Sequence, residues 1–304
     1  MWKLSGAAVA LIVCSSPVAH AAPQAGLPGF YGLYVVCDDA IVRAAASSSY
    51  LREFGGLVVK ESKSSEGHFR SLFLFGEHSE FEMLAPGDVD LDHAVTTGPG
   101  RTGIELVTDQ VGGLERFKAA IAPTGTRLRI QTQHKPVEGH DVEWFTAAEP
   151  AALPEDAQAA PPGFETEAIE FAASFLDNPG THKAPSRGPG DTVARARYLR
   201  DLHNPAQPMR DIAGATFALT RERWQIVRPM YVAAGFRVQD TATGARAVGD
   251  ATLEFVFAPE AHGGLRRVEF ELRKAPSAPH TEQLGRSVLV VGPGPHAVWT
   301  FDAR

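Results

Sequence analysis

The stretch Phe69–Asp88, FRSLFLFGEHSEFEMLAPGD, contains two predicted strands joined by a tight turn at Gly76. The first strand, 71–75, is apolar on both faces, which is typical of a strand in the middle of a sheet. In the second strand, 78–84, polar and apolar residues alternate, so the two faces of the strand differ. One of these faces carries an imidazole and two carboxylates, from His78, Glu80 and Glu82. Such a face is either a functional site or a face wetted by solvent.

The composition is that of an ordinary globular protein with an acidic balance. The chain has 304 residues, of which 44% are hydrophobic and 21% are charged. This length is enough for one large domain or two domains of ordinary size. The formal net charge is −7, and the sequence has no basic run. We therefore do not expect nucleic acid or an anionic membrane surface as a partner.

The first 22 residues have the pattern of a secretory signal peptide. Lys3 supplies a positive charge, Leu4–Val13 is a short apolar segment, and a small-x-small pattern ends at Ala21. We expect cleavage after Ala21 and a secreted or periplasmic mature chain without stable membrane insertion. Two alternatives remain open, namely lipoprotein processing at Cys14 and a buried N-terminal helix.

A unit of one strand, one helix and three strands repeats along the chain. The first unit is predicted at 31–37, 38–54, 57–61, 71–75 and 78–84. The second unit is predicted at 103–109, 111–121, 127–133, 141–146 and 165–171. The third unit is predicted at 211–219, 220–234, 236–240, 251–258 and 265–272. Two further strands, 287–291 and 297–301, would begin an incomplete fourth unit.

Each unit alone would leave one face of its sheet exposed, so we expect the units to pair. The predicted fold is α+β, with repeated β-α-β-β-β modules paired into curved, mostly antiparallel sheets with helices outside. The expected organisation is a signal peptide, a first module pair, a connector and a further module, at 1–22, 23–174, 175–208 and 209–304. Paired modules of this kind would curl around a shared cleft.

The order of elements resembles the vicinal oxygen chelate superfamily, which includes glyoxalases, bleomycin-resistance proteins and extradiol dioxygenases. The segments that carry the resemblance are LYVVCDDAIVRAAA, SLFLFGEHSEFEML, GIELVTDQVGGLERFKAAI and IAGATFALTRERWQIVRPMYVAAGFRV, with ATLEFVF and RRVEFEL. Within that superfamily the chain looks most like glyoxalase-like bacterial proteins. The match is one of element order and covers about two thirds of the mature chain.

The resemblance implies a divalent metal held by a histidine on the first strand of a unit and a glutamate on its last strand. Glu82 matches the last-strand glutamate of the first unit, whereas the first-strand position falls near Gly32 or Leu33, which cannot ligate a metal. In the third unit, Glu269 or Glu271 would be the matching glutamate. Carboxylates are thus present where the histidines are missing.

Other side chains are candidates for ligand contact. Trp144 is expected in the core or in the wall of the cleft. A short helix between the two halves carries Arg197, Tyr198 and Arg200, and its guanidinium groups could bind an anionic ligand through paired hydrogen bonds. The alternative is a helix face exposed to solvent.

Two functional hypotheses follow, with a third kept open. The first is a secreted glyoxalase-like protein that binds a small molecule in the cleft between modules, with or without catalysis. The second is a metal-dependent lyase, isomerase or dioxygenase in which Glu82 acts as metal ligand or general base, with His78 beside it. The third is a structural or interaction protein of the cell envelope.

Overall fold

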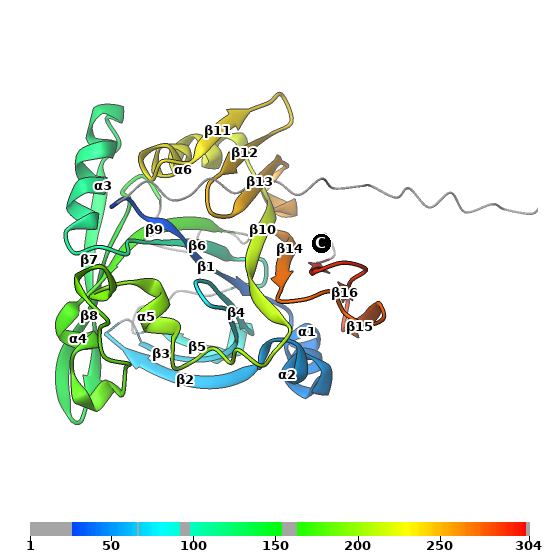
Figure 1. Ribbon diagram of the computed structural model, residues 1–304. Coiled ribbons are helices and arrows are strands. Elements are labelled where there is room, and N and C mark those ends of the chain that lie inside the picture. The colour runs from blue at the N-terminus through cyan, green and yellow to red at the C-terminus, as the bar shows by residue number, and fades with distance from the viewer. Residues whose placement is uncertain (1–25, 66, 92–97, 154–162, 302–304) are drawn as a thin grey trace, which may run out of the picture.

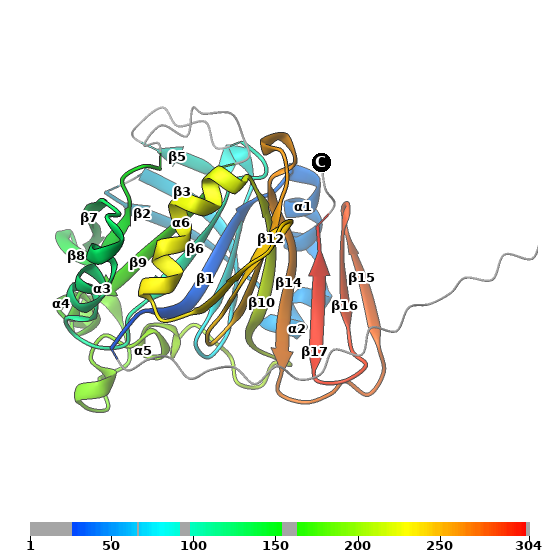
Figure 2. The same ribbon diagram turned by 90° about the horizontal axis from the view of Figure 1, so that it is seen from above.

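The computed structural model describes residues 26–65, 67–91, 98–153 and 163–301. The predicted signal peptide and Cys14 lie outside the described residues. Two curved sheets form the body of the protein, and helices lie beside and between them (Figures 1 and 2). Within the described ranges, no helix is both long and apolar enough to cross a bilayer.

The first sheet joins the first two units. Its strands are β1 (Gly29–Val36), β2 (Val58–Ser64), β3 (Gly67–Phe75), β4 (Glu80–Leu84), β5 (Val89–Leu91), β6 (Thr102–Val107), β7 (Leu128–Val137), β8 (His140–Pro150) and β9 (Phe164–Phe171). Their order is β2-β3-β4-β1-β6-β9-β8-β7, and β5 pairs with β3. Strands β1 and β6, the first strand of each unit, are antiparallel neighbours at the centre.

This sheet curls until its two edges meet at one end. The backbone N–H of Ser65, just after β2, donates to the carbonyl oxygen of His134 on β7 at 3.0 Å. The Ser65 hydroxyl also donates to Oε1 of Gln133 at 2.6 Å. The first sheet is therefore an almost closed, eight-stranded barrel, as Figure 1 shows when viewed into its open end.

The helix predicted at 38–54 is two helices, α1 (Asp39–Ser47) and α2 (Ser49–Gly55). Asp38 caps α1 by accepting from the N–H groups of Ala40 and Ile41. Ser48 has extended dihedral angles and caps α2 through its hydroxyl, which accepts from Leu51 N–H. The serine run therefore divides the helix, because a serine side chain competes for backbone hydrogen bonds. The helix of the second unit is α3 (Gly113–Ile121).

The second sheet contains eight strands from the C-terminal part of the chain. They are β10 (Met209–Leu219), β11 (Arg237–Asp240), β12 (Gly244–Val248), β13 (Thr252–Phe257), β14 (Gly264–Leu272), β15 (His280–Leu284), β16 (Ser287–Val291) and β17 (His296–Thr300). Their order is β11-β12-β13-β10-β14-β17-β16-β15, with α6 (Arg221–Ala233) after β10. The order within each half is the same as in the first sheet.

The predicted strand assignment of the third unit was wrong in one respect. The short strand β12 was missed, so the segment 265–272 was counted as the last strand of the third unit. It is β14, the first strand of a fourth unit, and it pairs antiparallel with β10. No helix follows β14 before β15, so this unit has four strands alone.

The place of the missing helix is taken by the helices of the first unit. The Ser48 hydroxyl donates to Glu282 on β15 at 2.7 Å, and the Tyr50 ring stacks on the His280 ring with centroids 3.7 Å apart. Arg286 pairs with Asp38 at 2.6 Å. Figure 2 shows α1 and α2 beside the strands of the fourth unit.

The connector between the sheets contains the short helices α4 (Ala173–Leu176) and α5 (Arg195–Leu199). Short 3-10 turns occur at Pro86–Asp88, Ala122–Thr124, Pro179–Thr181, Pro189–Asp191 and Glu260–His262. In Figure 1, α5 lies over the open end of the curled first sheet. The short helix predicted between the two halves is α5, which ends at Leu199, before Arg200.

The two sheets pack together through aromatic side chains on the convex face of the first. Phe81 on β4 contacts Phe270 and Trp299 of the second sheet, with ring centroids 6.3 and 5.5 Å apart. Phe164 on β9 contacts Phe217 on β10 at 5.3 Å. The α+β architecture of repeated modules in curved, mostly antiparallel sheets is thus confirmed.

Replacing Phe81 with alanine should lower the free energy of unfolding by about 3–5 kcal/mol, because it empties a fully buried aromatic position between the sheets. Urea unfolding followed by circular dichroism measures this loss. Val290→Ala is the control, since Val290 is 40% exposed and should change stability by less than about 1 kcal/mol. Equal losses for the two variants would contradict the packing described.

Candidate functional site

The curled first sheet encloses a cavity of about 640 Å³. Strands of both units line it, and Tyr198 and Leu202 of the connector contribute at its open end. Its lining combines aromatic rings with ionisable groups. The aromatic residues are Tyr31, Tyr34, Phe69, Phe73, Phe75, Trp144, Phe145, Phe171 and Tyr198.

Four neighbouring strands place three carboxylates in one row across the cavity wall. Gly32 on β1 pairs with Glu80 on β4 on one side and with Glu105 on β6 on the other. Glu105 in turn pairs with Glu167 on β9. A Cβ atom at Gly32 would lie 3.0 Å from Cγ of Glu80 and 3.7 Å from Oε2 of Glu105. Glycine at this position therefore leaves room for both carboxylates.

Glu80 is the carboxylate most affected by its surroundings. The Tyr31 hydroxyl donates to its Oε2 at 2.8 Å. Burial, together with the neighbouring Glu82 carboxylate, raises the pKa of Glu80 to about 7. Burial also raises the pKa of Glu82. A carboxyl group that titrates near neutral pH can accept a proton from a bound molecule or donate one to it.

Two lysines line the side of the cavity where the sheet edges meet, and a third, Lys183 of the connector, lies close enough to interact with them. Lys60 on β2 lies 5.3 Å from the centroid of the Phe75 ring, and Lys135 on β7 lies 3.3 Å from that of Trp144. Lys183 of the connector lies 3.9 Å from the centroid of Tyr198 and donates to its carbonyl oxygen. Aromatic faces attract ammonium groups, which holds these lysines in place.

The lysines are close enough to affect one another. Burial, followed by repulsion from Lys60, lowers the pKa of both Lys135 and Lys183 to about 8. Burial also lowers the pKa of Lys60. The Glu80 carboxylate opposes these shifts in all three lysines. The lysines thus form one cluster that shares an electrostatic environment with Glu80.

Two ion pairs complete the polar lining. Arg101 Nε lies 2.7 Å from Glu165, and Arg129 Nε lies 2.7 Å from Glu149. These pairs neutralise four of the charged groups in the wall. The charges of these four residues are compensated within the protein, so the two ion pairs are poor candidates for ligand recognition.

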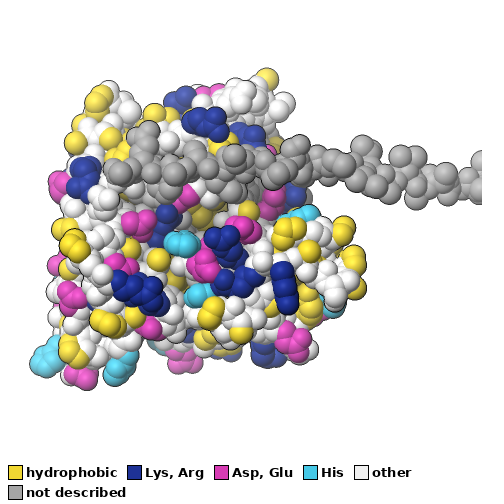
Figure 3. All heavy atoms as spheres, in the orientation of Figure 1, with side chains coloured by type: hydrophobic (Ala, Val, Ile, Leu, Met, Phe, Trp, Pro, Cys, Tyr) yellow, Lys and Arg dark blue, Asp and Glu magenta, His cyan; other side chains and the backbone are white. Residues whose placement is uncertain are grey.

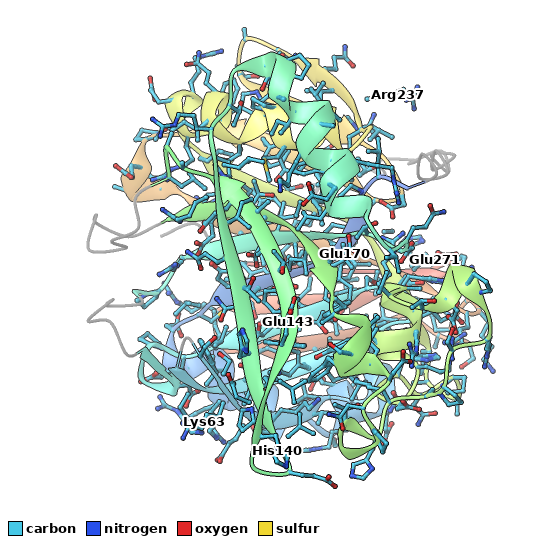
Figure 4. The ribbon with its side chains drawn as sticks, turned by 90° about the vertical axis from the view of Figure 1, so that its left-hand side faces the viewer. Lys63, His140, Glu143, Glu170, Arg237 and Glu271 are labelled. Carbon is cyan, nitrogen blue, oxygen red and sulfur yellow. The ribbon has the colours of Figure 1, made fainter. Side chains whose placement is uncertain are left out.

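Three of the predicted site residues line the cavity: Glu82, Trp144 and Tyr198. Trp144 points inward from β8, and its neighbour Glu143 lies on the outer side of that strand (Figure 4). Tyr198 stacks on Phe171 with ring centroids 4.3 Å apart. Alternation along β4 placed Glu82 on the inward face, whereas on β8 both Trp144 and the next residue, Phe145, line the cavity.

His78 does not share a strand face with Glu80 and Glu82. It lies in the turn before β4 begins at Glu80, and its Nδ1 is 3.2 Å from Oδ2 of Asp211 on β10. Attraction by Asp211 raises the pKa of His78. Charged and histidine side chains gather near β10 on the face shown in Figure 3. The expectation that His78 faces the cavity was wrong, because the turn is longer than predicted.

The two predicted anion-binding arginines are engaged within the connector. Arg197 is 1% exposed and donates to the carbonyl oxygens of Ala184, Thr192 and Leu176. Arg200 pairs with Asp191 at 2.7 Å. Neither lines the cavity. Their side chains brace the segment that presents Tyr198.

Glu269 lies on β14 of the second sheet and pairs with Arg267 at 3.1 Å. Its neighbour Phe270 points toward Phe81, so Glu269 points away from the first sheet. Glu82 likewise points away from the second sheet, into the cavity. The two carboxylates are therefore on opposite sides of the packed sheets and cannot share one ion.

Several residues in the cavity were not among the predicted site residues: Tyr31, Lys60, Glu105 and Lys135. Glu105 lies on a predicted strand, and Lys135 lies where β7 extends beyond the predicted strand 127–133. The sequence pattern was compatible with either an inward or an outward position for both side chains. Lysine is rarely buried in the wall of a cavity. The sequence feature that could have indicated a buried Lys60 is its position at the end of the apolar run Leu57–Val59.

The cavity does not fit the metal site that the resemblance implies. Among the described residues, three metal-ligating side chains bring ligand atoms within 4.8 Å of one another only at Glu77, His78 and Asp211, outside the cavity. Glu77 there is paired with Arg210 and Arg273. Within the cavity, the lysines oppose a second positive charge. We therefore derive no metal-dependent step at Glu82.

The fold defines a class of proteins built from paired β-α-β-β-β modules, and the first pair encloses a cavity. Within this class, the chain belongs to a family of unknown function (DUF5829), which matches residues 30–301. A search of curated proteins finds no match.

Solved structures with a similar arrangement span most of the chain. A hypothetical protein from Staphylococcus aureus is 9% identical with a TM-score of 0.52, over 87% of this chain and 98% of that one. The 2,3-dioxygenase LapB from Pseudomonas sp. KL28 is 15% identical with a TM-score of 0.43, over 91% and 92%. The Mn(II)-bound glyoxalase from Novosphingobium aromaticivorans is 11% identical with a TM-score of 0.41, over 88% and 78%. The first of these likenesses concerns the fold alone.

The Glu80→Gln variant should be more stable than the wild type at pH 8, and about equal to it at pH 4.5. In the native state the raised pKa favours the protonated carboxyl, so wild-type stability falls as pH rises from about 4.5 to about 7. Glutamine stays neutral and avoids this loss. Since one pKa unit corresponds to roughly 1.4 kcal/mol, we expect a gain of about 1–3 kcal/mol at pH 8.

Urea unfolding at the two pH values measures this difference. Glu61→Gln, on the outward face of β2, is the matched control and should change stability by less than about 0.5 kcal/mol at either pH. A Glu80→Gln variant that is less stable than the wild type at pH 8 would contradict the burial of an ionised Glu80.

Proposed function

We propose that the protein binds a small organic molecule in the cavity of the first sheet. The volume of about 640 Å³ lies within the range of small-molecule sites, and eight-stranded barrels are wide enough to hold one small ligand. Aromatic rings on the wall offer apolar contact area, and the ionisable groups among them offer points of orientation. The mixture is suited to a molecule with an apolar body and polar substituents.

One observation carries the proposal. Glu80 and Lys135 lie in the cavity wall with shifted pKa values, and neither forms an ion pair within 4.0 Å with a described side chain. Holding ionisable groups in a buried place without an ion-pairing partner costs stability. Groups retained at such a cost are concentrated at functional sites. Binding explains their presence better than packing does.

We also propose that binding takes place outside the cytoplasm, because the first 22 residues have the pattern of a signal peptide. Protein produced in a bacterial host should be found in the periplasm or medium with Ala22 as its first residue, as N-terminal sequencing would reveal. Leu11→Arg should keep it in the cytoplasm, because a charge interrupts the apolar segment. Exported protein that retains Met1 would argue against this assignment.

Filling the cavity should abolish binding without unfolding the protein. Ser62 lines the cavity from the edge strand β2, and its neighbour Lys63 faces outward on the same strand (Figure 4). We expect at least one compound from a metabolite extract to be retained by the wild type and by Lys63→Trp, and to be lost from Ser62→Trp. Equilibrium dialysis followed by mass spectrometry measures retention.

The comparison is valid only for variants with native circular dichroism spectra. Retention of the same compounds by Ser62→Trp would place binding elsewhere, and retention of none by the wild type would count against a binding function.

A further inference from the structure

We propose that the ligand of this cavity is an organic acid, whose carboxylate or phosphate group lies between Lys60 and Lys135 with Lys183 nearby. We call these three residues the lysine cluster. The inference rests on the proposed function and names the chemical class of molecule that the same cavity would take, namely an anionic group on an apolar body.

The lysine cluster is assembled from segments that are far apart in the sequence. Lys60 lies on β2 and Lys135 on β7, the two edge strands of the first sheet. These strands meet where the Ser65 N–H donates to the carbonyl oxygen of His134, and both lysines line the cavity. Lys183 of the connector is close enough to repel Lys135. Curling of the sheet thus brings like charges together at the cavity wall.

The ammonium groups of the lysine cluster have no anionic partner in direct contact. None forms an ion pair within 4.0 Å with a described side chain, and each lies over an aromatic face. Aromatic faces carry no formal charge, so they hold the ammonium groups without neutralising them. Burial, followed by repulsion from Lys60, lowers the pKa of Lys135 and Lys183. An anion placed among the three ammonium groups would relieve this repulsion.

The carboxyl groups of the cavity wall do not cancel the charge of the lysine cluster. Four of the glutamates in the wall interact with other residues of the protein: Glu105, Glu149, Glu165 and Glu167. The carboxyl groups that act on Lys135 are Glu80 and Glu82. Burial raises the pKa of both, to about 7 for Glu80, so it favours their neutral forms. Three ammonium groups therefore face two carboxyl groups that are not fully ionised near neutral pH.

Glu80 lies beside the place proposed for the anion. Phe75 pairs with Glu80 between β3 and β4, and Lys60 lies over the Phe75 ring and is attracted by Glu80. A protonated carboxyl donates a hydrogen bond to an anionic oxygen, whereas an ionised carboxylate repels it. Burial and the neighbouring Glu82 carboxylate already favour the protonated form of Glu80. The site is therefore suited to an anion when Glu80 carries its proton.

Aromatic rings beside the lysines define where the apolar body of the acid would lie. Phe75, under Lys60, stacks in parallel on Phe73 with ring centroids 5.0 Å apart. Trp144, under Lys135, contacts Phe145 with ring centroids 4.5 Å apart. These four rings all line the cavity. Apolar surface thus borders the anion site next to each lysine, which favours an acid with an aromatic or aliphatic body.

Matched pairs of charged and neutral probes test the inference by isothermal titration calorimetry at pH 6. The pairs are hexanoate with hexanamide, 3-phenylpropanoate with 3-phenylpropanamide, indole-3-acetate with indole-3-acetamide, and phenyl phosphate with phenol. We expect that in at least one pair the anion binds at least about ten-fold more tightly than its neutral partner. A preference confined to phenyl phosphate would identify phosphate as the anionic group.

The affinity for a preferred carboxylate should fall by at least about ten-fold between pH 6 and pH 9. Burial raises the pKa of Glu80 to about 7 and lowers that of Lys135 and Lys183 to about 8. The carboxyl is therefore protonated and the lysines are charged at pH 6, and both conditions are reversed at pH 9. The other titratable groups that act on these residues are Tyr31, Lys60, Glu82, Tyr198 and Asp201. Both tyrosines stay neutral over this range, because burial raises their pKa. Equal affinities at the two pH values would contradict the assignment.

Variants place the anion at the lysine cluster. Lys60→Met and Lys135→Met should each weaken the anion of a preferred pair by about ten-fold and leave its neutral partner unchanged, because each removes one ammonium group from the site. Lys63→Met is the matched control, since Lys63 lies on the outward face of β2 and should alter neither. Circular dichroism spectra establish that each variant is folded.

The outcomes separate this inference from the proposed function. If no pair shows a preference for the anion, including the case in which no probe binds, the inference is overturned. It is also overturned if Lys60→Met and Lys135→Met leave the affinity for a preferred anion unchanged, or weaken both members of its pair alike. The proposed function is judged independently by the compounds that Ser62→Trp loses. It stands without this inference if those compounds are all neutral or cationic.

Discussion

The antiparallel pairing of β1 with β6 is the contact on which the rest of the structure depends. It joins the first strands of two similar units and makes one eight-stranded sheet out of two four-stranded ones. Strand twist then curls this wide sheet until its edges meet beside Ser65. Without the central pairing there would be no interior, and the ionisable residues of β4, β6 and β7 would face solvent separately.

The curled first sheet has a convex and a concave face. This difference explains why the two sheets play different roles in the structure. The convex face of the first sheet carries Phe81 and Phe164, which pack against the second sheet. The concave face carries the aromatic and ionisable residues that line the cavity, and no described residue of the second sheet lines it. In the second sheet, ion pairs such as Arg267–Glu269 and Arg246–Glu254 lie on the outward face, where they are partly exposed. The cavity described above belongs to the first sheet.

The sequence predicted periodic features well and contacts between distant segments poorly. The repeated unit and the inward face of β4 followed from alternation, because a strand has a strict period of two. Five-residue β12 was missed since Gly244 and two alanines give it almost no hydrophobic pattern. Arg197 was expected to bind a ligand because a sequence shows a charge but not its partners. The lysine cluster draws on three segments far apart in the chain, so no local pattern could reveal it.

The absence of a helix in the fourth unit also bears on the folding of the chain. Because α1 and α2 cover β15 through Ser48 and Tyr50, the N-terminal quarter shields the C-terminal one. The two halves of the chain therefore depend on each other for the burial of their surfaces. Because the N-terminal half leaves the ribosome first, α1, α2 and the convex face of the first sheet would expose apolar surface during synthesis until the C-terminal strands had been made.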